Sequence, residues 1–190
     1  MKALVFTNYS QPPSIQEVPI PISTKDETLV KVVYCGVNRI DLATLARRFG
    51  NTLPFPLILG SEIVGILPNG KRVAVNPYLH CGKCKNCRKG KLLGCLRGRP
   101  LIGIQRNGGY AKYVSVPKTN IVPIPDDISF QDVCAVLVSA GTAYRMVCTW
   151  AKINNGAFVV VTAAGGGVGI YSCQLAKLHG AKVIALAGND

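Results

Sequence analysis

The chain has 190 residues, of which 48% are hydrophobic, enough to build a core and to exclude an intrinsically disordered protein. Lysine and arginine outnumber aspartate and glutamate by 22 to 9, which gives a formal net charge of +13. The amino terminus has only the five residues Ala3–Thr7 before polar and proline residues, and no apolar span of about 18 residues occurs. We therefore expect a soluble, cytoplasmic protein without a signal peptide or membrane span.

The first 125 residues show the short apolar runs and frequent prolines of an antiparallel β domain. Strands are predicted at Lys2–Phe6, Thr28–Tyr34, Lys71–Val75 and Gly109–Val116. A helix is predicted at Ile40–Phe49, because its apolar residues recur at helical spacing. The apolar run Leu57–Leu67 is broken by Gly60 and Gly65.

A segment rich in cysteine, glycine and lysine follows at residues 80–99 and has no periodicity. Its cysteines have the spacing C-x2-C-x2-C-x7-C and are Cys81, Cys84, Cys87 and Cys95. Four thiolates in one loop can enclose a tetrahedral Zn²⁺ with no open position, so we predict one structural zinc ion. An iron–sulfur cluster is the main alternative, but its clustered motif has a last spacing of three residues followed by proline.

The remaining cysteines stand singly in apolar surroundings and are interpreted as buried thiols; they are Cys35, Cys134, Cys148 and Cys173. No chemical role is predicted for His80 or His179.

No acidic residue lies between Glu62 and Asp126, whereas twelve lysines or arginines do. Such a patch could bind nucleic acid, but a surface that offsets a negative metal–thiolate centre is the favoured interpretation.

The carboxyl-terminal part has the pattern of a helical link followed by a nucleotide-binding unit. One or two helices are predicted within Ser129–Trp150. A β-branched run then leads into a glycine-rich turn, a helix at 168–179 and a second apolar run at 181–186. This order has the form of a dinucleotide-binding βαβ unit. Its predicted cofactor-binding residues are Ala164, Gly165, Gly166, Gly167, Val168 and Gly169.

Several motifs along the chain together resemble one enzyme family. They are CGVNRID at 35–41, PLILGSEIVG at 56–65, RVA at 72–74, the four-cysteine spacing, GGYAKYV at 108–114, TAY at 142–144 and AAGGGVG at 163–169. In this order they resemble the medium-chain dehydrogenase/reductases, which include zinc alcohol dehydrogenases and quinone reductases. The resemblance implies a mixed α/β fold. A GroES-like antiparallel β domain at 1–125, with the zinc lobe at 81–95, would precede linking helices and a partial Rossmann domain at 126–190.

The resemblance also indicates what is missing. The alcohol dehydrogenases of the family hold a catalytic zinc with a cysteine, a histidine and a third cysteine or carboxylate. Asn38 and Ser61 stand at the first two places here, and Val138 or Ser139 at the third, so no catalytic zinc is expected. Asn38 resembles the zinc-independent quinone and enoyl reductases. By that similarity Asn38 would lie beside the nicotinamide ribose or substrate carbonyl and Thr142 near the nicotinamide, with Ser61 a further candidate. Asn38 could instead simply cap the following helix.

These features predict an NAD(P)H-dependent reductase acting on a small carbonyl, enone or quinone. No carboxylate stands at Ala187, after the second strand, which favours NADP(H) over NAD(H). Only two strands of a nucleotide domain of about six are present, so we expect a truncated product or fragment, or a homo-oligomer that covers the open strand edge. A zinc-dependent alcohol dehydrogenase and a non-enzymatic, zinc-stabilised or oligomerising module remain alternatives. Nucleic-acid binding is not favoured.

Overall fold

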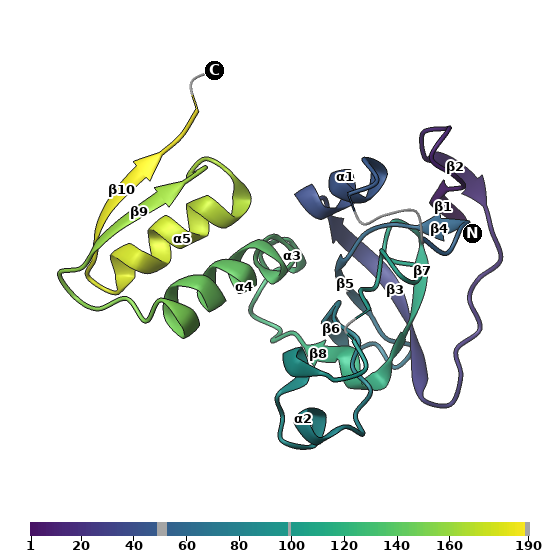
Figure 1. Ribbon diagram of the computed structural model, residues 1–190. Helices are drawn as coiled ribbons and strands as arrows, with labels where there is room; N and C mark the ends of the chain where they lie inside the picture. The colour runs from purple at the N-terminus through teal and green to yellow at the C-terminus, as the bar shows by residue number, and fades with distance from the viewer. Residues whose placement is uncertain (49–52, 99, 189–190) are drawn as a thin grey trace. The chain divides into compact units, whose positions relative to one another are not determined.

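The computed structural model describes residues 1–48, 53–98 and 100–188. The chain divides into two compact units, Met1–Cys134 and Ala135–Asp190, and each is considered by itself. Figure 1 gives the element labels used below.

The first unit is mostly antiparallel β structure. Its strands are β1 (Lys2–Phe6), β2 (Ser14–Glu17), β3 (Glu27–Gly36), β4 (Leu57–Ile58), β5 (Glu62–Ile66), β6 (Arg72–Val75), β7 (Tyr113–Pro117) and β8 (Ile121–Pro123). Its helices are α1 (Arg39–Leu45), α2 (Lys85–Arg88) and the 3-10 turns η1 (Leu92–Gly94) and η2 (Lys118–Asn120), while α3 (Phe130–Leu137) begins in it. The strands form a three-stranded sheet, β2-β1-β4, and a five-stranded sheet, β7-β3-β5-β6-β8.

The five-stranded sheet carries the main hydrophobic core of this unit. Burial runs through consecutive positions of β5 and β6, so both faces of the sheet are covered there, and β-branched side chains supply most of the packing. The core residues are Val30, Ile63, Val73, Val75, Ile102, Val114 and Val116. Each of these side chains contributes about 1.5–3 kcal/mol on burial, so the core fixes the register of the central strands.

Glycines let three backbone segments cross tightly where β5 begins. Gly60 has φ +98°, and a Cβ on Gly108 would overlap the Gly60 carbonyl oxygen. At this crossing the Gly109 N–H donates to the Gly60 carbonyl oxygen at 2.8 Å. The Tyr110 N–H donates to the Leu59 carbonyl oxygen at 3.0 Å. The crossing brings Tyr110 close to the start of β5, which matters for the site below.

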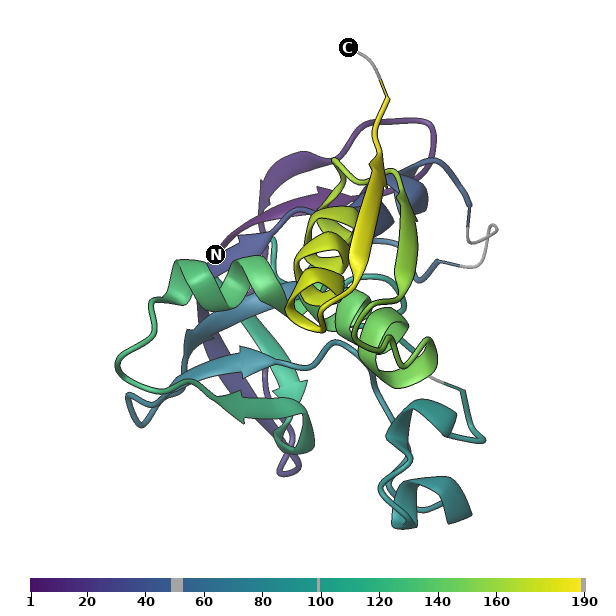
Figure 2. The ribbon, with the colours of Figure 1, turned by 90° about the vertical axis from the view of Figure 1, so that its left-hand side faces the viewer.

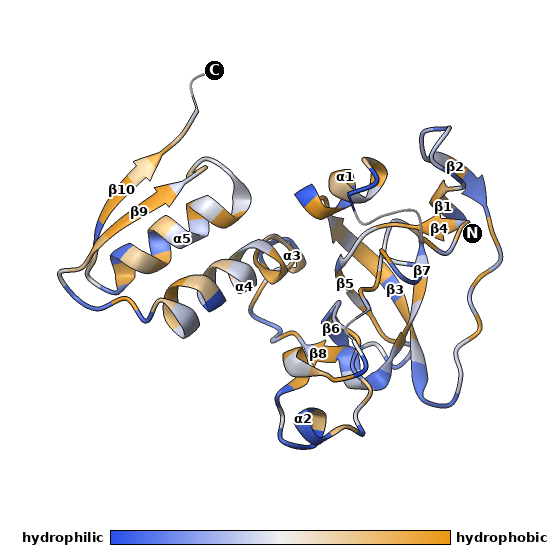
Figure 3. Ribbon diagram, in the orientation of Figure 1, coloured by the Kyte–Doolittle hydropathy of each residue, from blue (hydrophilic) through white to orange (hydrophobic). Residues whose placement is uncertain are grey.

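The cysteine-rich segment forms a lobe of short turns. In Figure 2 the teal segment around α2 extends away from the five-stranded sheet. Its only regular elements among the described residues are α2 and η1, of four and three residues. The lobe has little hydrophobic core, and in Figure 3 it is coloured largely as hydrophilic around α2.

The second unit contains the predicted strand–helix–strand arrangement. Its elements are α4 (Ser139–Tyr144), the π-helical segment η3 (Arg145–Trp150), β9 (Phe158–Thr162), α5 (Gly167–Leu178) and β10 (Lys182–Leu186). Strands β9 and β10 pair in parallel, from Lys182 opposite Phe158 to Leu186 opposite Thr162. Helix α5 ends at the predicted glycine, since Gly180 has φ +76°, a conformation that glycine adopts without strain. The predicted βαβ unit is therefore confirmed.

Several predicted boundaries were wrong. The strand predicted at Gly109–Val116 begins only at Tyr113, because Gly109 takes part in the tight crossing. The helix predicted at Ile40–Phe49 is α1, and Phe49 lies outside the described residues. Strand β2 was not predicted. No single described helix is long and apolar enough to span a membrane, although the bent pair Phe130–Leu137 and Ser139–Trp150 passes that test by length and composition alone.

Candidate functional site

The four cysteines of the lobe converge on one point. Their sulfur atoms all lie within 4.8 Å of one another, and no other group of three or more potential metal ligands converges in this way among the described residues. The Cys87 sulfur is 3.4 Å from that of Cys84 and 3.9 Å from that of Cys81. Sulfurs at about 2.3 Å from a tetrahedral zinc are about 3.8 Å apart, so these residues fit the ion.

Backbone donors already favour the thiolate form at this cluster. The N–H groups of Leu96 and Cys87 lower the pKa of the Cys84 thiol to about 6. Backbone N–H groups of Lys83 and Cys84 likewise lower the pKa of Cys81. Burial raises the pKa of Cys87 to about 12, so this ligand in particular needs a cation to become a thiolate.

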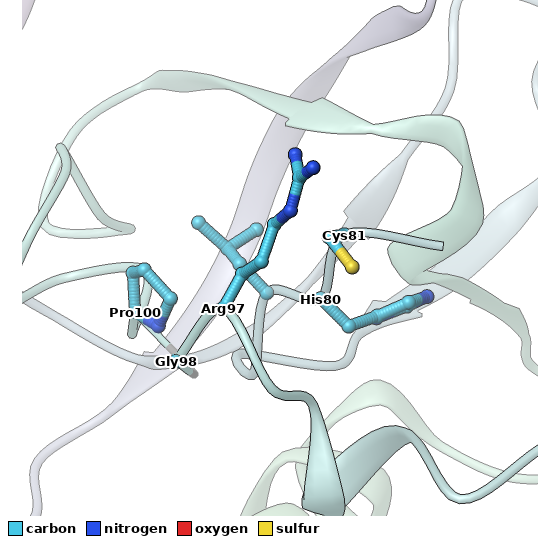
Figure 4. Close-up of a pocket in the computed structure, with 6 residues that line it drawn as sticks. His80, Cys81, Arg97, Gly98 and Pro100 are labelled. Atoms are coloured by element: carbon cyan, nitrogen blue, oxygen red, sulfur yellow. The ribbon is translucent and has the colours of Figure 1, made fainter. Parts of the chain in front are cut away.

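The surroundings of the cluster are cationic. The exposed basic side chains of the lobe are Lys83, Lys85, Arg88, Lys89, Lys91 and Arg97. Figure 4 shows Arg97 and His80 beside Cys81, around a small hollow of about 220 Å³. Positive charge here would offset the two excess negative charges of a four-thiolate zinc centre.

A second cluster of polar groups is buried between α1 and β5. The Asn38 side-chain amide donates to Glu62 Oε2 at 2.6 Å, and its backbone N–H donates to Asp41 Oδ2 at 2.8 Å. The Tyr110 hydroxyl donates to the same Asp41 oxygen at 2.9 Å. Asp41 and Glu62 are only 3% and 4% exposed. Asn38 thus stands at the N-cap of α1, as one of its two predicted roles requires, and also fixes a buried carboxylate.

Two thiols flank Glu62: Cys134 is buried, as predicted, whereas Cys35 is only half-buried. The Cys134 sulfhydryl donates to the Glu62 carbonyl oxygen at 3.5 Å. Burial raises the pKa of both Cys35 and Cys134, and the nearby carboxylates raise it further. Burial also raises the pKa of Tyr110, with Asp41 adding to the effect. Burial therefore favours the protonated form of all three groups.

The predicted catalytic residues are partly brought together. Asn38 is bonded to Glu62, and Ser61, 3% exposed, immediately precedes Glu62 at the start of β5. Thr142 belongs to the second unit, on α4, where its hydroxyl donates to the Val138 carbonyl at 2.7 Å. Asn38 and Ser61 belong to the first unit and Thr142 to the second, so the role predicted for Thr142 stays a prediction.

The glycine-rich turn has the shape that the motif requires. Gly166 is the N-cap of α5, and a Cβ on Gly165 would meet open space. A Cβ on Gly169 would overlap the Ala163 carbonyl oxygen, and Ala163 itself has φ +52°. The turn therefore combines an open helix N-terminus with close helix–strand packing, the two features by which such a turn accepts a pyrophosphate.

Comparison with known proteins agrees with this architecture. A family model described as the alcohol dehydrogenase GroES-like domain matches residues 24–126, more than half of the chain. The chain belongs to the alcohol dehydrogenase-like medium-chain dehydrogenase/reductase family. The antiparallel GroES-like domain and the mixed α/β fold class are thereby confirmed.

Individual relatives of this family resemble nearly the whole chain. L-threonine 3-dehydrogenase of Rhizobium etli (strain CIAT 652) is 30% identical over 199 residues, covering 98% of this chain and 56% of that protein. The crystal structure of an NAD-dependent alcohol dehydrogenase is 32% identical with a TM-score of 0.90, covering 100% of this chain and 58% of that one. A cobalt- and zinc-bound thermostable alcohol dehydrogenase from Pyrobaculum aerophilum is 33% identical with a TM-score of 0.85, covering 97% and 59%. The chain thus spans a little over half the length of these relatives.

Sequence reasoning missed two features of these clusters. Tyr110 was noted only within a motif, yet its hydroxyl contacts Asp41 across 69 residues of sequence. His179 and Cys148 were assigned no role, yet the Cys148 sulfur and His179 Nε2 are 3.2 Å apart. Neither pair has a signal in the sequence, because both depend on how distant segments pack.

Proposed function

We propose that this chain is the catalytic-type part of an NAD(P)H-dependent oxidoreductase of the quinone or enoyl reductase type, which works without a catalytic zinc. The observation that carries the proposal is the Asn38–Glu62 hydrogen bond. The bond holds the neutral amide of Asn38, and in the sequence Asn38 and Ser61 stand where the resemblance implies a cysteine and a histidine ligand. Neither Asn38 nor Ser61 offers the thiolate or imidazole that a catalytic zinc prefers, so zinc polarisation of an alcohol is not supported.

In this proposal the zinc ion is structural and is held by Cys81, Cys84, Cys87 and Cys95. Their sulfur separations match a closed tetrahedral shell, which leaves no position for a substrate. The ion would stabilise a lobe whose described residues form only short turns.

The nicotinamide cofactor would supply the hydride. The chain's own contribution would be to bind and orient. The open N-terminus of α5 would accept the pyrophosphate, since its first backbone N–H groups have no partner within the helix. Asn38, with its amide fixed by Glu62, would orient the substrate carbonyl or the nicotinamide ribose. The absence of a carboxylate at Ala187 favours NADP(H), which carries a further phosphate.

The organisation of the protein follows the same proposal. Residues 1–125 would form the catalytic-type domain, and residues 126–190 the linking helices and part of the nucleotide domain. The substrates would be small carbonyls, enones or quinones, and the protein would act in the cytoplasm as a homo-oligomer.

Two measurements on the purified chain test the proposal. Elemental analysis should find one zinc per chain. Titration with NADPH should quench the fluorescence of Trp150, the one tryptophan of the chain, which is 69% exposed in the second unit. One zinc with no response at millimolar NADPH would leave a non-enzymatic, zinc-stabilised module and contradict the reductase.

A zinc-dependent alcohol dehydrogenase is the second candidate, because the similar proteins carry the names of alcohol and threonine dehydrogenases. It requires a second metal. Two zinc ions per chain, together with oxidation of an alcohol by NAD⁺ or NADP⁺, would favour this candidate over the first.

A further inference from the structure

The second unit contains a cysteine–histidine pair that the reductase proposal does not use. Cys148 lies on η3 and is half-buried, while His179 lies at the end of α5 and is exposed. The Cys148 sulfur and His179 Nε2 are 3.2 Å apart. At this distance a proton can pass directly between the thiol and the imidazole, which is the arrangement of an activated nucleophile and its base.

The backbone of His179 is fixed by the end of the helix. His179 is the C-cap of α5, and its backbone N–H donates to the Leu175 carbonyl at 3.1 Å. Gly180 then turns the chain with φ +76° and packs against Asn155. Helix α5 also packs on η3, so both partners sit on elements that contact each other within the unit.

The charged side chains of residues 135–188 also favour a reactive thiol at Cys148. Residues 135–188 contain four basic side chains, Arg145, Lys152, Lys177 and Lys182, and no aspartate or glutamate. No carboxylate of this segment can therefore compete with the thiolate for the imidazolium. Arg145 lies over the Trp150 ring at 5.2 Å, on the same segment as Cys148. Cationic surroundings and partial exposure are the conditions under which a cysteine reacts as a thiolate.

We propose that Cys148 and His179 form a reactive thiol site for soft carbon electrophiles of the α,β-unsaturated carbonyl class. His179 Nε2 takes the thiol proton, and the sulfur attacks the β-carbon of the electrophile. A carbon–sulfur bond forms, the carbon–carbon π bond breaks, and the imidazolium returns its proton to the α-carbon. The product is a thioether, and no oxidant or reductant is consumed. The site acts independently of the proposed reductase activity.

The expected rate can be bounded from thiol chemistry. A thiol of ordinary acidity is only a few per cent thiolate at neutral pH, so proton removal can accelerate alkylation by up to about 30-fold, less the accompanying fall in nucleophilicity. Cys173 is the matched control, because it lies on α5, is also half-buried, and has no hydrogen bond to a histidine among the described residues. We therefore expect Cys148 to react at least about fivefold faster than Cys173.

The experiment is competitive labelling of the purified, folded chain with limiting N-ethylmaleimide at pH 7, followed by peptide mass spectrometry. Both cysteines are read in the same molecules, so differences in folding cancel. His179→Gln should bring the Cys148 rate to within about twofold of the Cys173 rate, while Cys173→Ser should leave the Cys148 rate unchanged. His179→Asn serves as a second variant if the glutamine variant loses its circular dichroism spectrum, since asparagine is well accepted at helix ends. Equal rates at the two cysteines in the wild-type chain, or a Cys148 rate that both folded histidine variants leave unchanged, would overturn the proposal.

Discussion

Removing one sulfur from the lobe should abolish tight zinc binding without disturbing the β core. The substitution is Cys84→Ser. The Cys84 sulfur lies 3.4 Å from that of Cys87, and all four sulfurs lie within 4.8 Å of one another, so the shell can close around zinc with little movement. A serine hydroxyl is a poor zinc ligand at neutral pH, which leaves three thiolates and an open position.

The size of the effect follows from the ligand count. Structural zinc sites in peptides have apparent Kd values of about 10⁻⁸ to 10⁻¹² M at neutral pH, so one ligand in four is worth roughly two decades or more. We therefore expect Cys84→Ser to weaken zinc binding about 100-fold or more. Because the hydrophobic core lies in the five-stranded sheet, the far-ultraviolet circular dichroism of the variant should change little.

The assay is zinc competition against a chromophoric chelator, with Cys173→Ser as the control. Cys173 lies on α5 in the second unit, so this control should keep one zinc per chain and the wild-type Kd. Two results would refute the reasoning: a wild-type chain that takes up no zinc, or a Cys173→Ser chain that loses zinc as readily as Cys84→Ser.

Three further predictions concern stability. Burial raises the pKa of the Glu27 carboxyl, but the Arg106 guanidinium, 2.9 Å away, lowers it, and the resulting pKa lies below its ordinary 4.5. Glu27→Gln should therefore lower the free energy of unfolding by about 1–2 kcal/mol in urea denaturation at pH 7. This difference from the wild-type chain should shrink as the pH falls below 4.5, because Glu27 of the folded wild-type chain is then protonated as the pH passes its lowered pKa. A difference that does not depend on pH would contradict this reasoning. Gly169→Ala should destabilise the second unit by about 1–3 kcal/mol in thermal denaturation followed by tryptophan fluorescence, because the added methyl group overlaps a backbone oxygen, whereas Gly165→Ala meets open space and should be nearly neutral. Ile63→Ala empties a fully buried position in the five-stranded sheet and should cost about 2–5 kcal/mol in urea; a loss below 1 kcal/mol would show that this core can collapse around the gap.

The sequence was most informative where a structure is built from neighbouring residues. The glycine turn, helix α5 and strand β10 follow one another within 30 residues, and each has its own local signal. The four cysteines likewise lie within one loop, so their convergence could be expected from spacing alone.

Features that depend on distant packing could not be predicted in this way. The Asn38–Glu62 bond joins residues 24 apart and depends on the pairing of β3 with β5, where Gly36 lies opposite Glu62. The approach of Cys148 to His179 depends on how α5 packs on η3. The late start of β7 reflects a glycine crossing whose partners are about 50 residues away. In each case the geometry comes from tertiary contacts and not from local propensity.

The absence of acidic side chains from residues 135–188 also has a kinetic consequence. An approaching ligand that carries several phosphates meets only attractive charges from the side chains of this segment, including Lys177 near the end of α5 and Lys182 at the start of β10. Attraction of this kind accelerates diffusional encounter and weakens beyond a Debye length of about 8 Å at physiological salt. Association rate constants of polyphosphate ligands should therefore fall steeply as salt is added, while dissociation rate constants change much less.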